Sequence, residues 1–356
     1  MGLLYRKGVR NMMPDYVLAF IIAIVVAYIL TPRVISLANK TGAMDAPDER
    51  KVHSKPIPRI GGLAIYFAFI VAALFTVDLT KEVVGLLTGA TVILVVGIID
   101  DFKSLPAKVK LMGQIIAAVV LVLFDVRIDC ITNPFGDMFF LSEYLAIPIT
   151  IFWIVGLTNT VNLIDGLDGL AAGVSTIAAI TILLVALQQG FLLVAVLTAA
   201  LAGAAMGFLQ YNFNPAKIFM GDTGSMFLGY MLAGISVLGA VKSAATIALI
   251  VPILALGLPI LDTTFAIIRR YLNGTPIFKP DRGHLHHRLL DMGFTQKQAV
   301  LLMYVISGGL GLSAIALTEV SRGLGLLIIL AVTCAVVFGA KKIGILKTKK
   351  SIETNQ

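Results

Sequence analysis

Runs of apolar residues without Lys, Arg, Asp or Glu recur along the chain and are separated by short polar stretches. A helix needs about 20 mainly apolar residues to cross a bilayer, so we expect each run to form one membrane-spanning helix. The uncharged residues 169–210 exceed one span, and we divide them at Gln188, Gln189 and Gly190. The eleven predicted spans are 16–32, 60–77, 83–99, 111–124, 144–164, 169–187, 191–210, 223–241, 243–261, 298–318 and 323–340.

Composition supports the same fold class. Hydrophobic residues make up 58% of the chain and charged residues 13%, whereas soluble domains carry about 25% charged residues; the mean hydropathy is +0.95. We therefore predict an all-α polytopic membrane protein, in which residues 1–356 form one domain of about eleven transmembrane helices with active-site loops on the cytoplasmic side. The two cysteines, Cys130 and Cys334, imply neither a disulfide framework nor a thiolate metal site.

The distribution of basic residues predicts the orientation, because short cytoplasmic loops carry the excess of Lys and Arg. Of the 28 basic residues, 21 lie in the segments 33–59, 100–110, 211–222, 269–297 and 341–356. We expect these segments and 159–170 to be cytoplasmic, with the N-terminus outside, the C-terminus inside and residues 125–143 facing outward. The net charge of +8 reflects this bias and does not indicate nucleic-acid binding.

Three of the four histidines lie in "GHLHHRLLDMG" (283–293): His284, His286 and His287. The fourth, His53, is also on the predicted cytoplasmic side. Because Arg282 and Arg288 flank the three histidines and would repel a cation, the stretch favours phosphate binding. A zinc site and a structural role are the alternatives.

Acidic and amide side chains gather in three further cytoplasmic stretches. Asp100 and Asp101 end the apolar run 83–99 and are followed by Lys103, Lys108 and Lys110, a combination that suggests Mg²⁺ and phosphate rather than a solvated helix end. "NTVNLIDGLDGL" (159–170) carries Asn159, Asn162, Asp165 and Asp168, and "FMGDTGS" (219–225) carries Asp222. Helix capping is the alternative for both stretches. Together these groups predict an oxygen-ligand site for a hard cation.

Five stretches, in this order and spacing, carry a specific resemblance: "RKVHSKPIPRIGG", "DDFKSLPAKVKLMGQ", "NLIDGLDGLAAG", "FMGDTGS" and "DRGHLHHRLLDMG". The chain resembles the polyprenyl-phosphate N-acetylhexosamine-1-phosphate transferases of glycosyltransferase family 4, which include phospho-MurNAc-pentapeptide translocase and the WecA/TagO branch. Leu285 interrupts the histidine run and Arg288 follows it, as in the WecA/TagO branch. This departure argues against a muramyl-pentapeptide substrate.

The resemblance implies transfer of a HexNAc 1-phosphate, with GlcNAc as the default sugar, from a UDP-N-acetylhexosamine to undecaprenyl phosphate with release of UMP. It also implies Mg²⁺ or Mn²⁺ as cofactor, the inner face of a bacterial plasma membrane as the setting, and the first membrane step of a cell-envelope glycan of the teichoic acid or O-antigen type. It leaves open whether the protein is a homodimer and which sugar it prefers. It also leaves open whether the acceptor attacks the donor directly or the reaction passes through an aspartyl-phosphate intermediate.

Matching positions carry the expected roles. For catalysis the resemblance implies Asp100, Asp101 and Asp165. For the metal it implies Asp222, Asn162 and Asp165, and for the nucleotide Asp168, Phe219 and Asn212. For the phosphates and the sugar it implies Lys110, Arg282, His284, His286, His287 and Arg288, with His53 and Asn159 as polar support.

Two rival functions use the same residues differently. A cation or proton transporter would need ionisable groups near the membrane midplane, where Asp262 is the one candidate, within the hydrophobic stretch 243–268. A CDP-alcohol phosphotransferase would need an Arg after the Ala in its Asp-Gly signature, and "DGLDGLAAG" has none. Both rivals therefore rank below the transferase.

Overall fold

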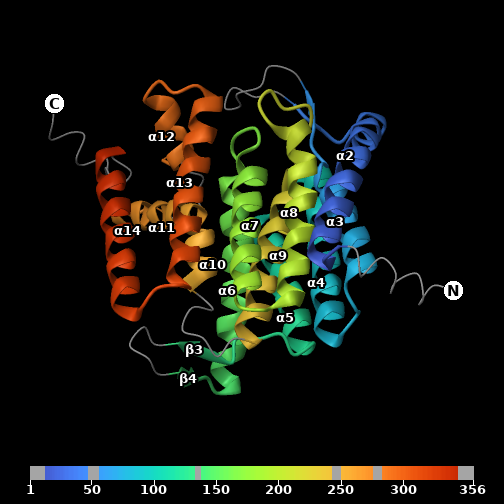
Figure 1. Ribbon diagram of the computed structural model, residues 1–356. Coiled ribbons are helices and arrows are strands. Elements are labelled where there is room, and N and C mark those ends of the chain that lie inside the picture. Colours follow the sequence, from blue (N-terminus) through green and yellow to red (C-terminus); the bar gives the residue numbers. More distant parts are fainter. Residues whose placement is uncertain (1–12, 47–55, 133–137, 243–249, 276–282, 344–356) are drawn as a thin grey trace, which may run out of the picture.

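The computed structural model describes residues 13–46, 56–132, 138–242, 250–275 and 283–343, and they form an all-α fold with two small hairpins (Figure 1). The helices are α2 (Asp15–Thr41), α3 (Gly62–Thr76), α4 (Lys81–Lys103), α5 (Ala107–Leu123), α6 (Glu143–Ile164), α7 (Leu170–Gln188), α8 (Leu192–Asn212), α9 (Gly221–Lys242), α10 (Ile250–Ala255), α11 (Gly257–Leu272), α12 (Leu285–Asp291), α13 (Gln296–Leu317) and α14 (Arg322–Ile343). The strands are β1 (Met44–Asp45), β2 (Ile57–Pro58), β3 (Cys130–Thr132) and β4 (Met138–Phe140).

Within the described residues, seven helices are long and apolar enough to cross a membrane: α2, α4, α6, α7, α8, α13 and α14. α3 is apolar but shorter. The chain is thus a multi-pass membrane protein, as predicted, while the count of eleven spans stays a prediction. The division of 169–210 is confirmed, because α7 ends at Gln188 and α8 begins at Leu192.

α9 is the central helix of the bundle. It packs against α3, α4, α6, α7 and α8, and side chains along its length, such as Phe227, Tyr230 and Met231, have no exposed surface. Its first turn carries Asp222, so the most enclosed helix of the protein also fixes one of the predicted metal ligands.

α2 and α8 meet along a seam of small residues. Ala19, Ala23 and Ala27, four residues apart on α2, are fully buried. A Cβ on Gly203 or Gly207 would lie 2.4 Å from the Phe20 carbonyl oxygen or 2.5 Å from that of Ile24. In a bilayer, close backbone approach of this kind replaces the hydrophobic effect as the main source of helix association.

The predicted span 243–261 is wrong as one continuous helix. Residues 243–249 lie outside the described part, α10 ends at Ala255, and α11 begins at Gly257 and continues to Leu272, beyond the predicted boundary at 269. Pro259 in the first turn of α11 cannot donate a backbone hydrogen bond to a preceding helix, so the helix restarts with a new direction. α11 runs across the axis of the other helices (Figure 1).

The two ends of the bundle differ in character. The β3–β4 hairpin, which pairs Cys130 with Phe140, lies at the end opposite α12 (Figure 1). At the α12 end, β1 pairs with β2, with Asp45 opposite Ile57. The segment predicted to face outward is therefore at the far end from the histidine helix, while the orientation of the bundle in the membrane stays a prediction.

Candidate active site

A pocket of about 710 Å³ opens at the α12 end of the bundle. α6, α8, α9, α12 and the chain around β2 each contribute to its wall. Its lining includes residues that the sequence assigned to the metal and the nucleotide: Asn162, Asp165, Asp168, Asn212, Phe219 and Asp222. His287 of α12 completes the same wall. Segments more than a hundred residues apart in sequence therefore converge on one cavity.

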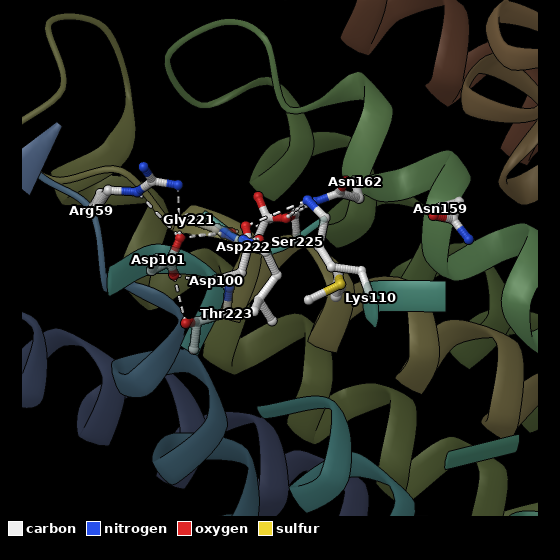
Figure 2. A network of polar contacts seen from close by, with 12 residues as sticks. Arg59, Asp100, Asp101, Lys110, Asn159, Asn162, Gly221, Asp222, Thr223 and Ser225 are labelled. Atoms are coloured by element: carbon white, nitrogen blue, oxygen red, sulfur yellow. Dashed lines mark hydrogen bonds and ion pairs between the residues drawn. The ribbon is translucent and has the colours of Figure 1, made fainter. Parts of the chain in front are cut away.

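The acidic centre of the site joins the end of α4 to the start of α9. Carboxylate oxygens of Asp100, Asp101 and Asp222 lie within 4.8 Å of one another, as Figure 2 shows. Asp222 sits in the first turn of α9, where the helix dipole favours negative charge. Of the described residues, these three form the one group with the geometry to hold a metal ion, and it contains no histidine.

Asp101 is completely enclosed and saturated with hydrogen bonds (Figure 2). Its Oδ1 accepts from Arg59 Nε at 3.2 Å, Arg59 Nη2 at 3.1 Å and Asp222 N at 2.9 Å. Its Oδ2 accepts from Thr223 N at 3.1 Å and Thr223 Oγ1 at 2.6 Å. With five donors on two oxygens, this carboxylate caps α9 and has no lone pair directed at the pocket.

Asp100 has a different set of partners. Its Oδ1 accepts from Leu105 N at 2.7 Å, and its Oδ2 lies 3.4 Å from Lys110 Nζ. The same ammonium donates to Asp222 Oδ2 at 2.7 Å, so Lys110 bridges Asp100 and Asp222 (Figure 2). The two carboxylates therefore share one positive charge, and the oxygens of Asp100 carry fewer bonds than those of Asp101.

The stretch 159–170 supplies the opposite wall. Asn162 Nδ2 donates to Ser225 Oγ at 2.8 Å, which ties α6 to α9. Asn159, one turn earlier, exchanges hydrogen bonds with Gln114 of α5 at 2.6 and 3.3 Å. Asn159 therefore supports the helices, whereas Asn162 also lines the pocket.

Asp165 follows the last residue of α6 and faces the acidic centre. Burial raises the pKa of its carboxyl to about 8, and the charges of Asp222 and Asp101 act in the same direction. In the absence of a cation, this carboxyl holds its proton at neutral pH. A divalent ion at the acidic centre would displace that proton.

A string of polar residues lines the nucleotide side of the pocket. Asp168 Oδ2 accepts from Asn214 Nδ2 at 3.0 Å and Ala216 N at 2.9 Å, and Asn214 also donates to Gln296 Oε1 at 2.9 Å. Asn212 is buried and donates to the Ile218 carbonyl at 2.9 Å, while its Oδ1 accepts no hydrogen bond from the described residues. The unpaired Oδ1 is itself a buried atom, so the side chain of Asn212 would have to turn for this oxygen to meet a ligand in the pocket.

The histidine stretch forms the start of α12, with His284 as its N-cap. The rings of His284 and His286 stack at 5.8 Å, and the ring of His287 lies 4.2 Å from that of His286. His287 reaches the pocket, whereas His284 and His286 are buried next to it. Burial lowers the pKa of His286 to about 3, assisted by His287, so this imidazole is neutral at physiological pH.

The other predicted binding residues divide into two groups. Arg288 is half-buried, and its Nε has no hydrogen-bond partner among the described residues. Arg282 and His53 lie outside the described residues, so their roles stay predictions.

Sequence reasoning missed several polar residues of the site, including Asp45 and Lys217 of the pocket wall. Arg59, Asn214 and Gln296 line the pocket, and Asp262, considered only as a transport residue, contacts His284. Arg59 belongs to a stretch that carried the resemblance and bridges Asp101 and Asp45. The sequence feature that could have marked Arg59 as a site residue is its position next to the apolar run, four residues after Lys55. Basic residues are expected at that position in any membrane protein, so the feature is not specific.

Comparisons with known proteins give a consistent result. The pattern that defines glycosyl transferase family 4 matches residues 83–240. The chain is 46% identical over 314 residues to the probable undecaprenyl-phosphate N-acetylglucosaminyl 1-phosphate transferase of Bacillus subtilis (strain 168), covering 88% of each chain. It is 38% identical over 339 residues to the decaprenyl-phosphate N-acetylglucosaminephosphotransferase of Mycobacterium tuberculosis (strain ATCC 25618 / H37Rv), covering 86% of this chain and 83% of the relative. It is 31% identical over 317 residues to the phospho-N-acetylmuramoyl-pentapeptide-transferase of Halalkalibacterium halodurans, covering 83% of this chain and 94% of the relative.

Proposed function

This chain belongs to glycosyl transferase family 4, and we propose that it transfers N-acetylglucosamine 1-phosphate from its UDP-activated donor to undecaprenyl phosphate, releasing UMP. The observation that carries the proposal is one pocket lined by carboxylates and an imidazole, with the Lys110 ammonium group bonded to one of those carboxylates, Asp222. Phosphoryl transfer depends mainly on positioning and charge neutralisation, which this set of groups can supply.

We propose Mg²⁺ as the cofactor, with Mn²⁺ as the alternative. The donor set fits a hard cation, because Asp222, Asp165 and Asn162, which all line the pocket, offer carboxylate and amide oxygens. Asp222, Asp165 and Asn162 would hold the ion. When bound, it would neutralise charge on the donor diphosphate.

Asp100 and Asp101 have unequal roles in this proposal. Asp101 fixes the start of α9 and so aims Asp222, because all its lone pairs are engaged by the protein. Asp100 lies next to Lys110 and Asp222, where it can position the attacking phosphate. A phosphate monoester is already largely dianionic at pH 7, since its second pKa is about 6, so a positioning role suffices and a general base adds little.

The nucleotide end is assigned to Asp168, Phe219 and Asn212. The unsatisfied, buried Oδ1 of Asn212 would suit the ring N–H of uracil after the side chain turns toward the pocket, because a donor there removes the penalty of an unpaired polar group. The partly buried ring of Phe219 offers an apolar face in the same pocket. Asp168, already oriented by Asn214, supplies a second acceptor.

The diphosphate and the sugar are assigned to His287 and Arg288, with Lys110 at the phosphates. Imidazole and guanidinium groups donate charge-assisted hydrogen bonds to phosphate oxygens. Arg282 and His53 retain the roles that the resemblance implies, whereas the buried His284 and His286 would act by supporting His287. The choice of GlcNAc over a muramyl-pentapeptide is supported by Leu285 within the histidine stretch and by the 46% identical relative, a probable undecaprenyl-phosphate N-acetylglucosaminyl 1-phosphate transferase.

The proposed acceptor and cellular setting are consistent with a multi-pass membrane protein of this family. The chain is multi-pass, so a lipid-linked phosphate meets a water-soluble donor at one end of the bundle. We propose the cytoplasmic face of a bacterial plasma membrane, at the first membrane step of a cell-envelope glycan such as teichoic acid or O-antigen. A homodimer remains an expectation.

The test is UMP release by purified protein in detergent with a panel of UDP-sugars. The expected result is release that requires both UDP-GlcNAc and undecaprenyl phosphate, with formation of lipid-linked GlcNAc diphosphate. The Asp222→Ala variant serves as the matched inactive control. Release with UDP-MurNAc-pentapeptide and not with UDP-GlcNAc would overturn the sugar assignment, and no lipid product with any donor would overturn the reaction.

A further inference from the structure

The histidine stretch is attached to a carboxylate in the transverse helix α11. Asp262 Oδ2 lies 2.9 Å from His284 Nδ1, and Asp262 Oδ1 accepts from Leu285 N at 2.7 Å. The side chains of Asp262 and His284 are 3% and 7% exposed. Both oxygens of this buried carboxylate are therefore used by the first residues of α12.

A short relay leads from this contact to the pocket. His284 stacks in parallel on His286, at an angle of 8°, and His286 contacts His287 on the pocket wall. A Cβ on Gly166 would lie 2.5 Å from His286 Nε2, so His286 fills the space between α12 and the loop that carries Asp165 and Asp168. A shift of His284 would accordingly move the imidazole that faces the substrate.

The chemistry of the contact fixes a tautomer. A carboxylate accepts only, so the His284 nitrogen that faces it carries the proton, and the other ring nitrogen is an acceptor in the neutral ring. The far side of Asp262 borders a cavity of about 380 Å³ lined mainly by apolar residues of α11, α13 and α14. In such surroundings a hydrogen bond to a charge is strengthened and its loss is costly.

We propose that Asp262 is the positioning residue of the histidine stretch: by holding His284 Nδ1–H and capping α12, it sets the orientation of His286 and His287 for the donor. The inference rests on the proposed transfer reaction, and it extends that reaction to a residue of α11 that does not line the pocket. Carboxylates that orient an active imidazole from behind are commonly needed for full activity.

The key variant is Asp262→Asn, which keeps an oxygen for Leu285 N but presents an amide N–H₂ to His284. The imidazole must then carry its proton on the other nitrogen, so geometry is retained and the tautomer is reversed. We expect kcat/KM for the UDP-sugar to fall about ten- to a hundredfold, with the Mg²⁺ requirement within about twofold of wild type, because the metal is held elsewhere. Asp125→Asn, which removes an exposed carboxylate paired with Lys81, is the matched control and should retain wild-type activity.

A double-mutant cycle with His284→Ala separates positioning from general stability. If Asp262 acts through His284, Asp262→Asn costs nothing further once the imidazole is gone, whereas independent effects on folding would add. Should Asp262→Asn fail to accumulate, His284→Asn and His284→Ala test the contact from its other side. The amide of Asn can still donate to Asp262, so it should keep at least tenfold more activity than Ala.

An activity-independent readout distinguishes failure of the inference from failure of the proposed reaction. A nitroxide attached at the exposed Met292, with Cys130 and Cys334 replaced by Ser, reports the mobility of α12. Asp262→Ala, which removes the contacts with both His284 and Leu285 N, should increase that mobility even if the wild type transfers no sugar. Wild-type activity in Asp262→Asn, additive losses in the cycle, or unchanged nitroxide mobility in Asp262→Ala would each overturn the proposal.

Discussion

Replacing Asp101 with Asn tests whether the two adjacent acidic residues have separate roles. The carboxylate accepts five hydrogen bonds, and Asn can keep only one of its two oxygens. The less costly orientation places the new nitrogen at Oδ2, since Thr223 Oγ1 can rotate to accept from it. The buried N–H of Thr223 then faces another N–H and loses its partner.

The magnitude follows from these contacts. An unsatisfied buried N–H costs about 1–3 kcal/mol, and loss of the charge opposite the partly exposed Arg59 adds about 1 kcal/mol or less. We therefore expect Asp101→Asn to destabilise the protein by about 2–4 kcal/mol. Asp100→Asn keeps an oxygen for Leu105 N and loses the charge that attracts Lys110 at 3.4 Å, but it also relieves the repulsion between Asp100 and Asp222. Because these two effects oppose each other, we expect a smaller loss of stability than for Asp101→Asn.

The assay compares the two variants by thermal unfolding in detergent and by UMP release well below both unfolding temperatures. The heating rate is kept constant, because irreversible unfolding makes the apparent Tm depend on it. Asp101→Asn should lower Tm clearly more than Asp100→Asn does. Relative to its decrease in Tm, Asp100→Asn should lose more activity than Asp101→Asn does. Wild-type Tm together with abolished turnover in Asp101→Asn would refute the reasoning and return Asp101 to a direct part in the chemistry.

Four further predictions use the same assays. Asp222→Ala should lower kcat strongly and raise the Mg²⁺ concentration needed for half-maximal activity, since it removes a proposed ligand without opening the core; near-normal turnover at low Mg²⁺ would leave Asp222 as a helix cap. His287→Ala should slow UDP-sugar turnover about ten- to a hundredfold, which corresponds to the loss of one charge-assisted hydrogen bond of about 1.5–3 kcal/mol. The Mg²⁺ requirement should change little. Stoichiometric zinc in active protein would contradict the phosphate role. Because the pKa of Asp165 is raised to about 8 and Mg²⁺ must displace its proton, Mg²⁺ affinity should rise from pH 6.5 to about pH 8 and then level off. Asp165→Asn should abolish this pH dependence. An equally steep rise in Asp165→Asn would show that the displaced proton comes from another group. In a background without native cysteines, Lys108→Cys should resist a membrane-impermeant thiol reagent in intact cells and Phe139→Cys should react, and the reverse pattern would invert the predicted orientation.

The fold was predictable where hydropathy alone decides it. Most apolar runs coincide with one helix each, because an uncharged stretch of bilayer length has few alternatives to a helix. The exception was 243–261, where Pro259 and the residues around it redirect the chain. Hydropathy records how apolar a segment is and carries no information on its angle, so the transverse path of α11 could not be predicted from that signal.

The site was predictable as a set of residues, and the resemblance that assembled this set is confirmed by the family comparison. The partners within the set were not predictable. Asp100 and Asp101 are chemically identical neighbours in sequence, and only the fold shows that one is saturated and the other is not. Asn214, Gln296 and Asp262 are single polar residues whose importance depends on contacts with segments far away in the chain.

The bridging position of Lys110 has a consequence for how the protein is made. Asp100, Lys110 and Asp222 all precede residue 223, whereas His287 and Gln296 come from segments that leave the ribosome much later. The acidic centre is therefore synthesised before the histidine end of the pocket. Lys110, only ten residues after Asp100, supplies a counter-charge from within the same early segment. In an assembly intermediate with α4, α5 and α9 in place, Lys110 would thereby balance one of the two charges of Asp100 and Asp222 without help from a metal or from the C-terminal helices.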